Sequence, residues 1–194
     1  MDRIKSAYEI AMEKAEEISK ETSIDEDRLE RREELKPLLA QFYNEEIDVD
    51  QLWKKLQDRD KSLLVEAQVM VLESLGLRTS EEEFKKRKKV ILGIEQLKGD
   101  GQTSRIENSL TKLRQLQQRY SNDRNRIEEQ LEREMNNSEM QLKQVQTDDG
   151  RTVMKMEPGV DRETQQKYKK AISQTEAQYS ERFNMLIQDI KTSF

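Results

Sequence analysis

Residues 104–131 read SRIENSLTKLRQLQQRYSNDRNRIEEQL, and the spacing of their side chains decides the fold. Positions on one helical face recur at alternating intervals of four and three residues: Ile106, Leu110, Leu113, Gln117, Tyr120, Arg124, Ile127 and Leu131. A second stretch repeats this spacing: Tyr168, Ile172, Thr175, Tyr179, Arg182 or Phe183, Leu186 and Ile190. Because such intervals return to the same side of an α-helix, each stretch is predicted to be a helix with one adhesive stripe.

A segment that contains Gly and Pro separates the two stretches, and its Asp149-Gly150 pair is a strong turn signal. Two striped helices joined by a turn predict an antiparallel coiled-coil hairpin over residues 102–194, about 50 Å long at roughly 1.5 Å per residue. Strand-forming residues flank the turn at Val145 to Thr147 and at Thr152 to Met156. A small β-hairpin is therefore predicted at the tip, within residues 143–160.

The first 99 residues predict a helical bundle that precedes the hairpin. An opening amphipathic helix carries apolar side chains three and four residues apart: Ile4, Ala7, Tyr8, Ala11, Met12, Ala15 and Ile18. Apolar residues surround the segment 63–75 on nearly all sides, so this segment is predicted to be the buried centre, and Trp53 is expected in the core. The break Gly99-Asp100-Gly101 marks the boundary between the two parts. The predicted fold class is therefore all-α.

Composition narrows the classes of function. Charged residues make up 39% of the chain and apolar residues 33%, which favours long, thin helical packing over one large core. The chain contains no Cys and no His, so disulfides, the common zinc sites and Ser-His or Cys-His nucleophile pairs are excluded by inventory. We therefore expect no enzymatic activity, no cofactor and no metal. No apolar run approaches a membrane span and the N-terminus lacks the apolar region of a signal peptide, so a cytoplasmic location is expected.

The densest basic run is a candidate binding surface: Lys85, Lys86, Arg87, Lys88 and Lys89. Residues 84–119 contain ten Lys or Arg against three acidic residues, whereas residues 21–60 contain 13 acidic residues and seven basic ones. One interpretation is a surface for a nucleic acid or another anionic partner, because clustered cations bind phosphates. The other, which the overall acidity favours, is charge complementarity with the acidic region or a solvated helix face.

The predicted tip is the candidate site for a partner: Val145, Asp149, Gly150, Met154 and Met156. Met154 and Met156 alternate along one face, with Val145 expected across from them, and flexible Met side chains suit adaptable binding surfaces. The alternative is that these residues cap the end of the coiled coil. Gln117 and Arg124 fall on the stripe of the first helix, where polar residues set register and pairing.

Two resemblances accompany these patterns. The opening residues, from Ile4 to Lys14, resemble the N-terminus of uncharacterised bacterial proteins of unknown function, which implies a bacterial origin. The layout of helix, β-hairpin and helix is similar in outline to a prefoldin subunit, although the first 100 residues have no counterpart there.

The function expected first is a non-catalytic α-helical scaffold or adaptor that binds protein partners through its coiled-coil arm. The alternative is a nucleic-acid- or ribosome-associated factor that uses the basic stretch 84–119, and a chaperone-like holdase comes third. No membrane partner is expected. Off-stripe apolar residues at Leu116, Met135 and Leu142 allow two arrangements: a second hairpin could pack there to give a homo-oligomeric four-helix bundle, or the N-terminal bundle could dock.

Overall fold

The computed structural model describes residues 26–137, 140–146, 152–158 and 162–194. The chain is predominantly helical, which confirms the predicted class. The opening helix predicted from Ile4 to Ile18 and the predicted turn at Asp149-Gly150 lie outside the described residues. In the part that the structure describes, no helix is both long and apolar enough to cross a membrane.

The chain forms two compact units. The N-terminal unit comprises Met1–Leu75, Ser80–Glu107 and Lys191–Phe194. The arm unit comprises Gly76–Thr79 and Asn108–Ile190. The last four residues therefore belong with the N-terminal unit, although the first of them, Lys191, is the final residue of the second long helix.

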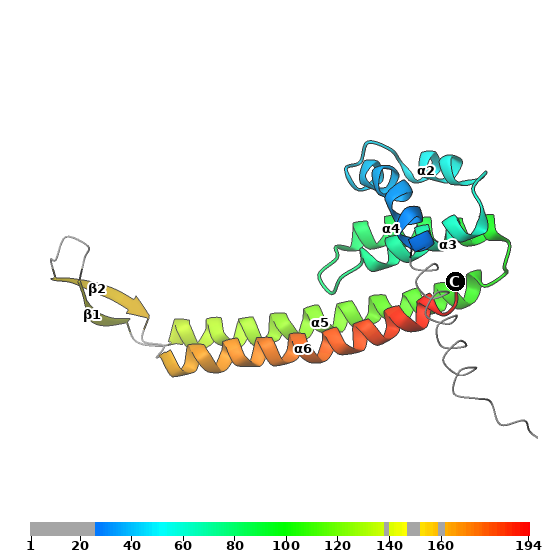
Figure 1. The fold of residues 1–194 in the computed structure, drawn as a ribbon. Coiled ribbons are helices and arrows are strands. Elements are labelled where there is room, and N and C mark those ends of the chain that lie inside the picture. Colours follow the sequence, from blue (N-terminus) through cyan, green and yellow to red (C-terminus); the bar gives the residue numbers. More distant parts are fainter. Residues whose placement is uncertain (1–25, 138–139, 147–151, 159–161) are drawn as a thin grey trace, which may run out of the picture. The chain divides into compact units, whose positions relative to one another are not determined.

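In the N-terminal unit, a helix over residues 26–43 precedes α2 (Val49–Leu56), α3 (Lys61–Glu73) and α4 (Glu81–Lys98) (Figure 1). Helix α3 packs on α4, and α2 also contacts α4. As its all-round apolar pattern predicts, α3 is buried along most of its length: Leu63, Leu64, Glu66, Ala67, Gln68, Val69, Val71 and Leu72. This helix forms the centre of the unit.

Local capping chemistry sets the helix ends in this unit. Asp48 and Ser80 each form a capping box at the starts of α2 and α4, in which the cap side chain and the third helical residue satisfy each other's backbone N–H groups. Asp60 accepts a hydrogen bond from the Leu63 amide and caps α3. Gly99 ends α4 with φ 71°, a left-handed conformation that glycine adopts without steric cost.

Trp53 departs from its predicted place in the core. The indole is 39% exposed and lies over α4 at Gly93, where a Cβ atom would come within 3.4 Å of its Cδ1. Helix α2 is short and amphipathic, and it buries Leu52 and Leu56 instead. The large aromatic ring therefore covers the unit from outside, because the two leucines already fill the inward face of α2.

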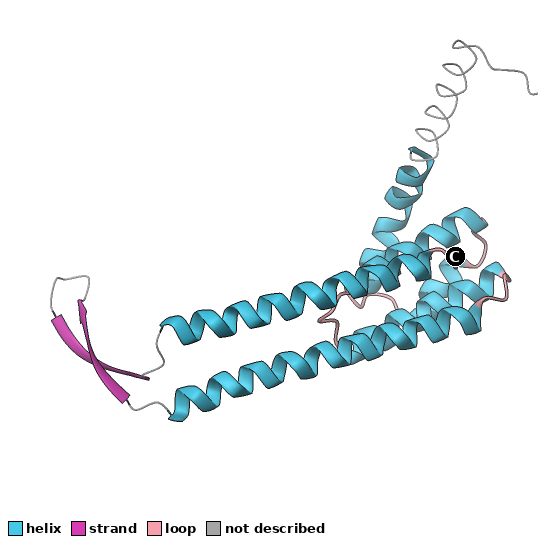
Figure 2. Cartoon of the chain, turned by 90° about the horizontal axis from the view of Figure 1, so that it is seen from below, coloured by secondary structure: helices cyan, strands magenta, loops and turns pink. Residues whose placement is uncertain are grey.

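The arm unit is built on two long helices, α5 (Thr103–Asn137) and α6 (Arg162–Lys191), which run antiparallel and side by side (Figures 1 and 2). Between them, β1 (Met140–Gln146) and β2 (Thr152–Pro158) pair antiparallel. The buried positions of the two helices lie in the first half of α5 and in the last part of α6: Ile106, Leu110, Leu113, Gln117, Tyr120, Phe183, Ile187 and Ile190. We call this half of the arm basal, and the half next to the strands distal.

Candidate interaction site on the arm unit

The predicted tip residues lie partly on the strands. Val145 pairs with Val153, whereas Met154 pairs with Gln144 and Met156 with Leu142. The expectation that Val145 lies across from the two methionines is therefore wrong, because Val145 is one residue away from the partner of Met154 and three residues away from the partner of Met156. Asp149 and Gly150 lie outside the described residues.

The predicted basic surface lies on α4, and most of its cations contact groups of the same unit. Lys85 pairs with Glu81 at 2.6 Å and Lys88 with Glu107 at 2.7 Å. Lys86 reaches Glu45 at 2.5 Å, and this hydrogen bond raises the pKa of the lysine and lowers the pKa of the glutamate. One of the two interpretations of the basic run was charge complementarity with the acidic region 21–60. The contact between Lys86 and Glu45 is one ion pair of that kind.

Arg87 and Lys89 complete the run. Arg87 donates to the main-chain oxygen of Ser74 at 2.7 Å, and its guanidinium lies 5.4 Å from the centre of the Tyr43 ring, a cation–π distance. Lys89 is exposed and forms no ion pair within the described residues. The five side chains are consecutive in the chain, but the helix distributes them around α4, so they do not form one continuous basic face.

In the arm unit, tyrosine hydroxyls join α5 to α6. The Tyr179 hydroxyl donates to Asp123 at 2.6 Å, and the Tyr168 hydroxyl donates to Glu134 at 2.6 Å. The tyrosines are eleven residues apart and so are the carboxylates, which is three helical turns or about 16 Å. Both ties therefore specify one and the same antiparallel register.

The environment of these hydroxyls alters their acidity. The hydrogen bond to Asp123 raises the pKa of Tyr179, and burial adds to the effect. The hydrogen bond to Glu134 likewise raises the pKa of Tyr168. Both phenols are therefore held in the protonated form that donates the bond.

The basal half of the arm has its own polar contacts. Arg78 donates from a single nitrogen, Nη2, to both carboxylate oxygens of Glu176 at 2.9 Å, and its Nε donates to the Tyr120 hydroxyl at 3.4 Å. The rings of Tyr120 and Tyr179 lie 5.6 Å apart between centroids in a tilted arrangement. These contacts join the segment 76–79 and the two long helices within the arm unit.

The two polar stripe residues differ in what they contact. Gln117 is 2% exposed, donates to the main-chain oxygen of Gly76 at 2.6 Å and accepts from Arg114 at 3.1 Å. Arg124 is half-buried and pairs with Glu128, one turn along the same helix. Neither contact reaches α6, whereas the tyrosine hydroxyls do join the two helices, so these contacts do not support the register role predicted for Gln117 and Arg124.

Sequence reasoning placed Tyr168 and Tyr179 on the stripe but missed their acidic partners. A signal for them exists in the chain: in an antiparallel pair with fixed register, partner positions have residue numbers with a constant sum, and Tyr179 with Asp123 has the same sum as Tyr168 with Glu134. The Arg78–Glu176 contact joins residues 98 positions apart and has no local signal.

The residues of the stripe become less buried from the basal half of the arm to the distal half. Toward the base, Leu113, Tyr120 and Phe183 are buried. In the distal half, the stripe and its flank remain only partly covered at Ile127, Leu131, Ala171 and Ile172. Two helices alone thus leave an apolar strip accessible on the distal arm.

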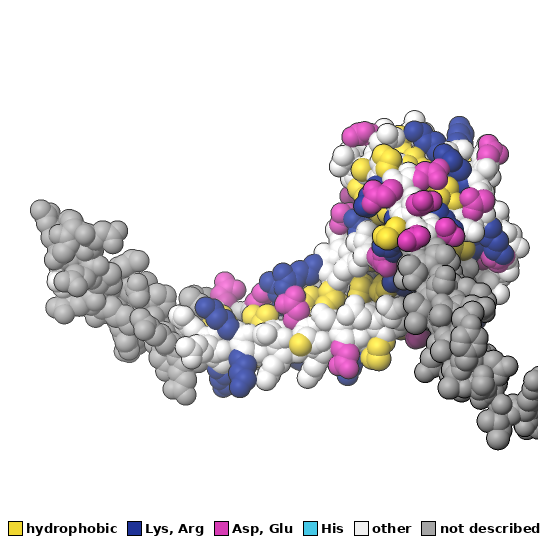
Figure 3. Space-filling view, viewed as in Figure 1, with side chains coloured by type: hydrophobic (Ala, Val, Ile, Leu, Met, Phe, Trp, Pro, Cys, Tyr) yellow, Lys and Arg dark blue, Asp and Glu magenta, His cyan; other side chains and the backbone are white. Residues whose placement is uncertain are grey.

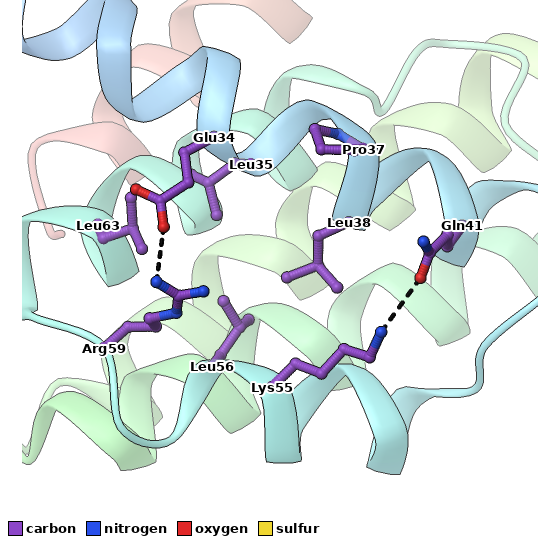
Figure 4. A pocket seen from close by; sticks show the side chains of 9 residues that line it. All are labelled: Glu34, Leu35, Pro37, Leu38, Gln41, Lys55, Leu56, Arg59 and Leu63. Atoms are coloured by element: carbon purple, nitrogen blue, oxygen red, sulfur yellow. Dashed lines mark hydrogen bonds and ion pairs between the residues drawn. The ribbon is translucent and has the colours of Figure 1, made fainter.

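A hollow of about 350 Å³ lies in the N-terminal unit between the helix over residues 26–43 and the segment 55–63 (Figure 4). Its apolar lining comes from Leu35, Pro37, Leu38, Leu56 and Leu63. Arg59 pairs with Glu34 at 2.6 Å and Lys55 donates to Gln41 at 3.2 Å at its edge. On the face of this unit that Figure 3 displays, apolar patches are small and interrupted by charged side chains. In the described residues, no three acidic side chains converge on a position that could hold a metal ion.

Residues 49–192 match the family of unknown function DUF6657. The chain belongs to this family. The match begins at the first residue of α2 and continues through α6, so the DUF6657 region includes both the basic run and the tied arm. No curated protein and no solved structure matches the chain.

Proposed function

We propose that this DUF6657 protein is a non-catalytic α-helical scaffold or adaptor whose arm binds a protein partner. In this proposal α5 and α6 form an antiparallel coiled coil, the helices of the N-terminal unit form a bundle, and the protein acts in the cytoplasm. The observation that supports it is the distal stripe, which is held in a fixed register but only partly covered.

The proposal rests on the apolar surface that the distal stripe leaves accessible. Burial of apolar area contributes roughly 25 cal/mol per Å², so half-covered positions such as Ile127, Leu131 and Ile172 gain free energy when another helix covers them. The tyrosine ties fix the relative position of the two helices before the partner arrives, which lowers the ordering cost of binding. A fixed, partly apolar helical surface is suited to another helix.

A nucleic-acid partner at residues 84–119 is less well supported. Lys85, Lys86, Arg87 and Lys88 each contact a carboxylate or carbonyl of their own unit, so binding phosphate there would first require these contacts to break. The holdase alternative would use Met154 and Met156, which lie two residues apart on β2.

A cross-linking pull-down with the full chain tests the proposal. The bait is compared with the variant Ile127→Gln/Ile172→Gln, which makes the half-covered strip polar, and with the control Lys54→Gln at an exposed position of α2. We expect protein partners that survive nuclease and moderate salt, that are kept by the control and that are lost by the arm variant. Partners that are kept by the arm variant and removed by nuclease would contradict the proposal and favour the basic run.

A further inference from the structure

The distal arm carries opposite charges at one level. Residues 128–134 of α5 contain four glutamates and one arginine, whereas residues 164–170 of α6 contain three lysines and no acidic residue. The bond between Tyr168 and Glu134 places these two segments side by side. Each arm therefore has an acidic edge on α5 and a basic edge on α6 at the same distance along its length.

These charges are only partly used within one arm. Glu128 pairs with Arg124 and Glu129 pairs with Arg133, both along α5. Lys167, Lys169 and Lys170 are exposed and form no ion pair within the described residues. The basic edge thus remains available beside the half-covered strip.

A partner that covers this strip has to meet two conditions. It must bring apolar side chains to Ile127, Leu131, Ala171 and Ile172, and it must place acidic groups near α6 and basic groups near α5. The distal arm itself carries that same combination of surfaces. A second arm is therefore complementary to the first.

We propose that the partner of the distal strip is a second copy of this chain, with two arms side by side in the same direction as a four-helix bundle. A twofold axis parallel to the arms puts α5 of one copy beside α6 of the other at the same level. The acidic edge of each arm then meets the basic edge of its neighbour, in two identical contacts. Turning one arm around, with the two arms still overlapping along their whole length, would move the two distal segments apart by the length of the arm. This inference rests on the proposed function, because it names the partner of the same surface.

Sedimentation of the full chain with paired charge reversals tests the proposal. The first variant, Lys167→Glu/Lys169→Glu/Lys170→Glu, has two acidic edges, and the second, Glu128→Lys/Glu129→Lys/Glu132→Lys, has two basic edges. We expect a wild-type dimer that weakens as salt rises, and a dissociation constant raised about tenfold or more in each variant alone. An equimolar mixture of the two variants should recover a dimer, because each then meets its complement. Lys54→Glu, an exposed reversal on α2, is the matched control and should leave the dimer unchanged.

Spin labels test the direction of the arms. The chain has no Cys, so single labelling sites can be introduced at Gln115 and Gln130, which are both exposed on α5. Arms in the same direction give similar, short distances between the two copies at both sites. A long distance at either site would overturn the proposed arrangement.

Two further outcomes also contradict the inference. One is a chain that stays monomeric up to its solubility limit, and the other is a pair of reversal variants that associate as tightly as the wild type while circular dichroism shows normal helix content. A monomeric chain that still captures a protein through Ile127 and Ile172 would remove this inference and leave the proposed function standing.

Discussion

Gly93 lies in the middle of α4, where glycine costs roughly 0.5–1 kcal/mol relative to alanine. A Cβ atom there would lie 3.4 Å from Trp53 Cδ1, a distance that the partly exposed indole can accommodate. We expect Gly93→Ala to raise the free energy of unfolding by up to about 1 kcal/mol. Chemical denaturation followed by Trp53 fluorescence measures it.

The control for this substitution is Gly99→Ala at the end of α4. Gly99 has φ 71°, so a side chain there is strained even though nothing lies within 4 Å of the new Cβ. A loss of about 1 kcal/mol is expected. If both substitutions destabilised the protein equally, the cover of Gly93 by Trp53 would be tighter than described.

Lys98 and Glu95 form a buried ion pair at 2.9 Å, with both side chains 0% exposed. Lys98 also donates to Gln68 at 2.7 Å and to the main-chain oxygen of Phe194 at 3.0 Å. Lys98→Met would leave the Glu95 carboxylate without its cation, so we expect a loss of about 3 kcal/mol or more. Urea denaturation provides the measurement.

The double variant Lys98→Met/Glu95→Gln separates the charge effect from lost packing. It removes both charges and keeps an amide that can still bond to the Gln102 main chain, which Glu95 contacts at 3.2 Å. Stability should recover by more than half of the loss. If the double variant were no more stable than Lys98→Met, the loss of stability would come from packing around Phe194 and not from the unpaired carboxylate.

At the scale of elements, the pair α5 and α6 depends on hydroxyls that donate to carboxylates. Because the folded pKa values of Tyr168 and Tyr179 are raised above 10.0, the ties are intact below pH 10 and are lost as pH rises through the folded values. A phenolate would then face Asp123 or Glu134. We expect the melting temperature of the arm helices, followed by circular dichroism, to fall above pH 10.

The variant Tyr168→Phe/Tyr179→Phe tests the cause of this fall. Removing the hydroxyls should lower stability modestly near pH 7, by about 0.5 kcal/mol for the Tyr179 tie after allowance for solvent. It should also reduce the additional loss above pH 10 relative to the wild type. Tyr43, whose pKa is raised by burial in the N-terminal unit, would leave a residual dependence in the variant. An unchanged alkaline slope would rule out the tyrosine ties as its source.

The elements that depend on neighbours in the chain were predictable from the sequence. The Ser80 and Glu83 capping box and the stop at Gly99 follow from residues three or fewer positions away from the helix end, and the helix periodicity follows from spacing alone. Contacts between distant segments were not predictable. Lys86 pairs with Glu45, which is 41 positions away in the chain. In the strands, a shift of one residue changes every pairing, and the sequence does not specify the register. The exposure of Trp53 was not predictable either, because it depends on which residues of α2 face the core.

At the scale of the whole molecule, those described carboxylates whose pKa values are clearly lowered lie in the N-terminal unit. Hydrogen bonds from Lys86 and Lys61 lower the pKa values of Glu45 and Asp100. Burial alone would raise the pKa of Glu73, but hydrogen bonds from Lys191 and Arg32 outweigh it and hold the value below 4.5. Their contribution to stability is present above the unfolded pKa values, 4.5 for Glu and 3.8 for Asp, and is lost as pH falls through the lower folded values.

Acid should therefore unfold the N-terminal unit progressively below about pH 4.5. Trp53, the only tryptophan of the chain, lies in this unit, so its fluorescence reports the transition selectively. In Glu73→Gln the glutamine cannot ion-pair with Lys191 and Arg32, which hold Glu73 at 2.6 and 2.8 Å. The variant should be less stable than the wild type at pH 7 and should approach it near pH 3, because acid removes the same contacts from the wild type. A stability difference that stays constant from pH 7 to pH 3 would mean that Glu73 acts through packing, and the acid transition would then have to originate in other carboxylates.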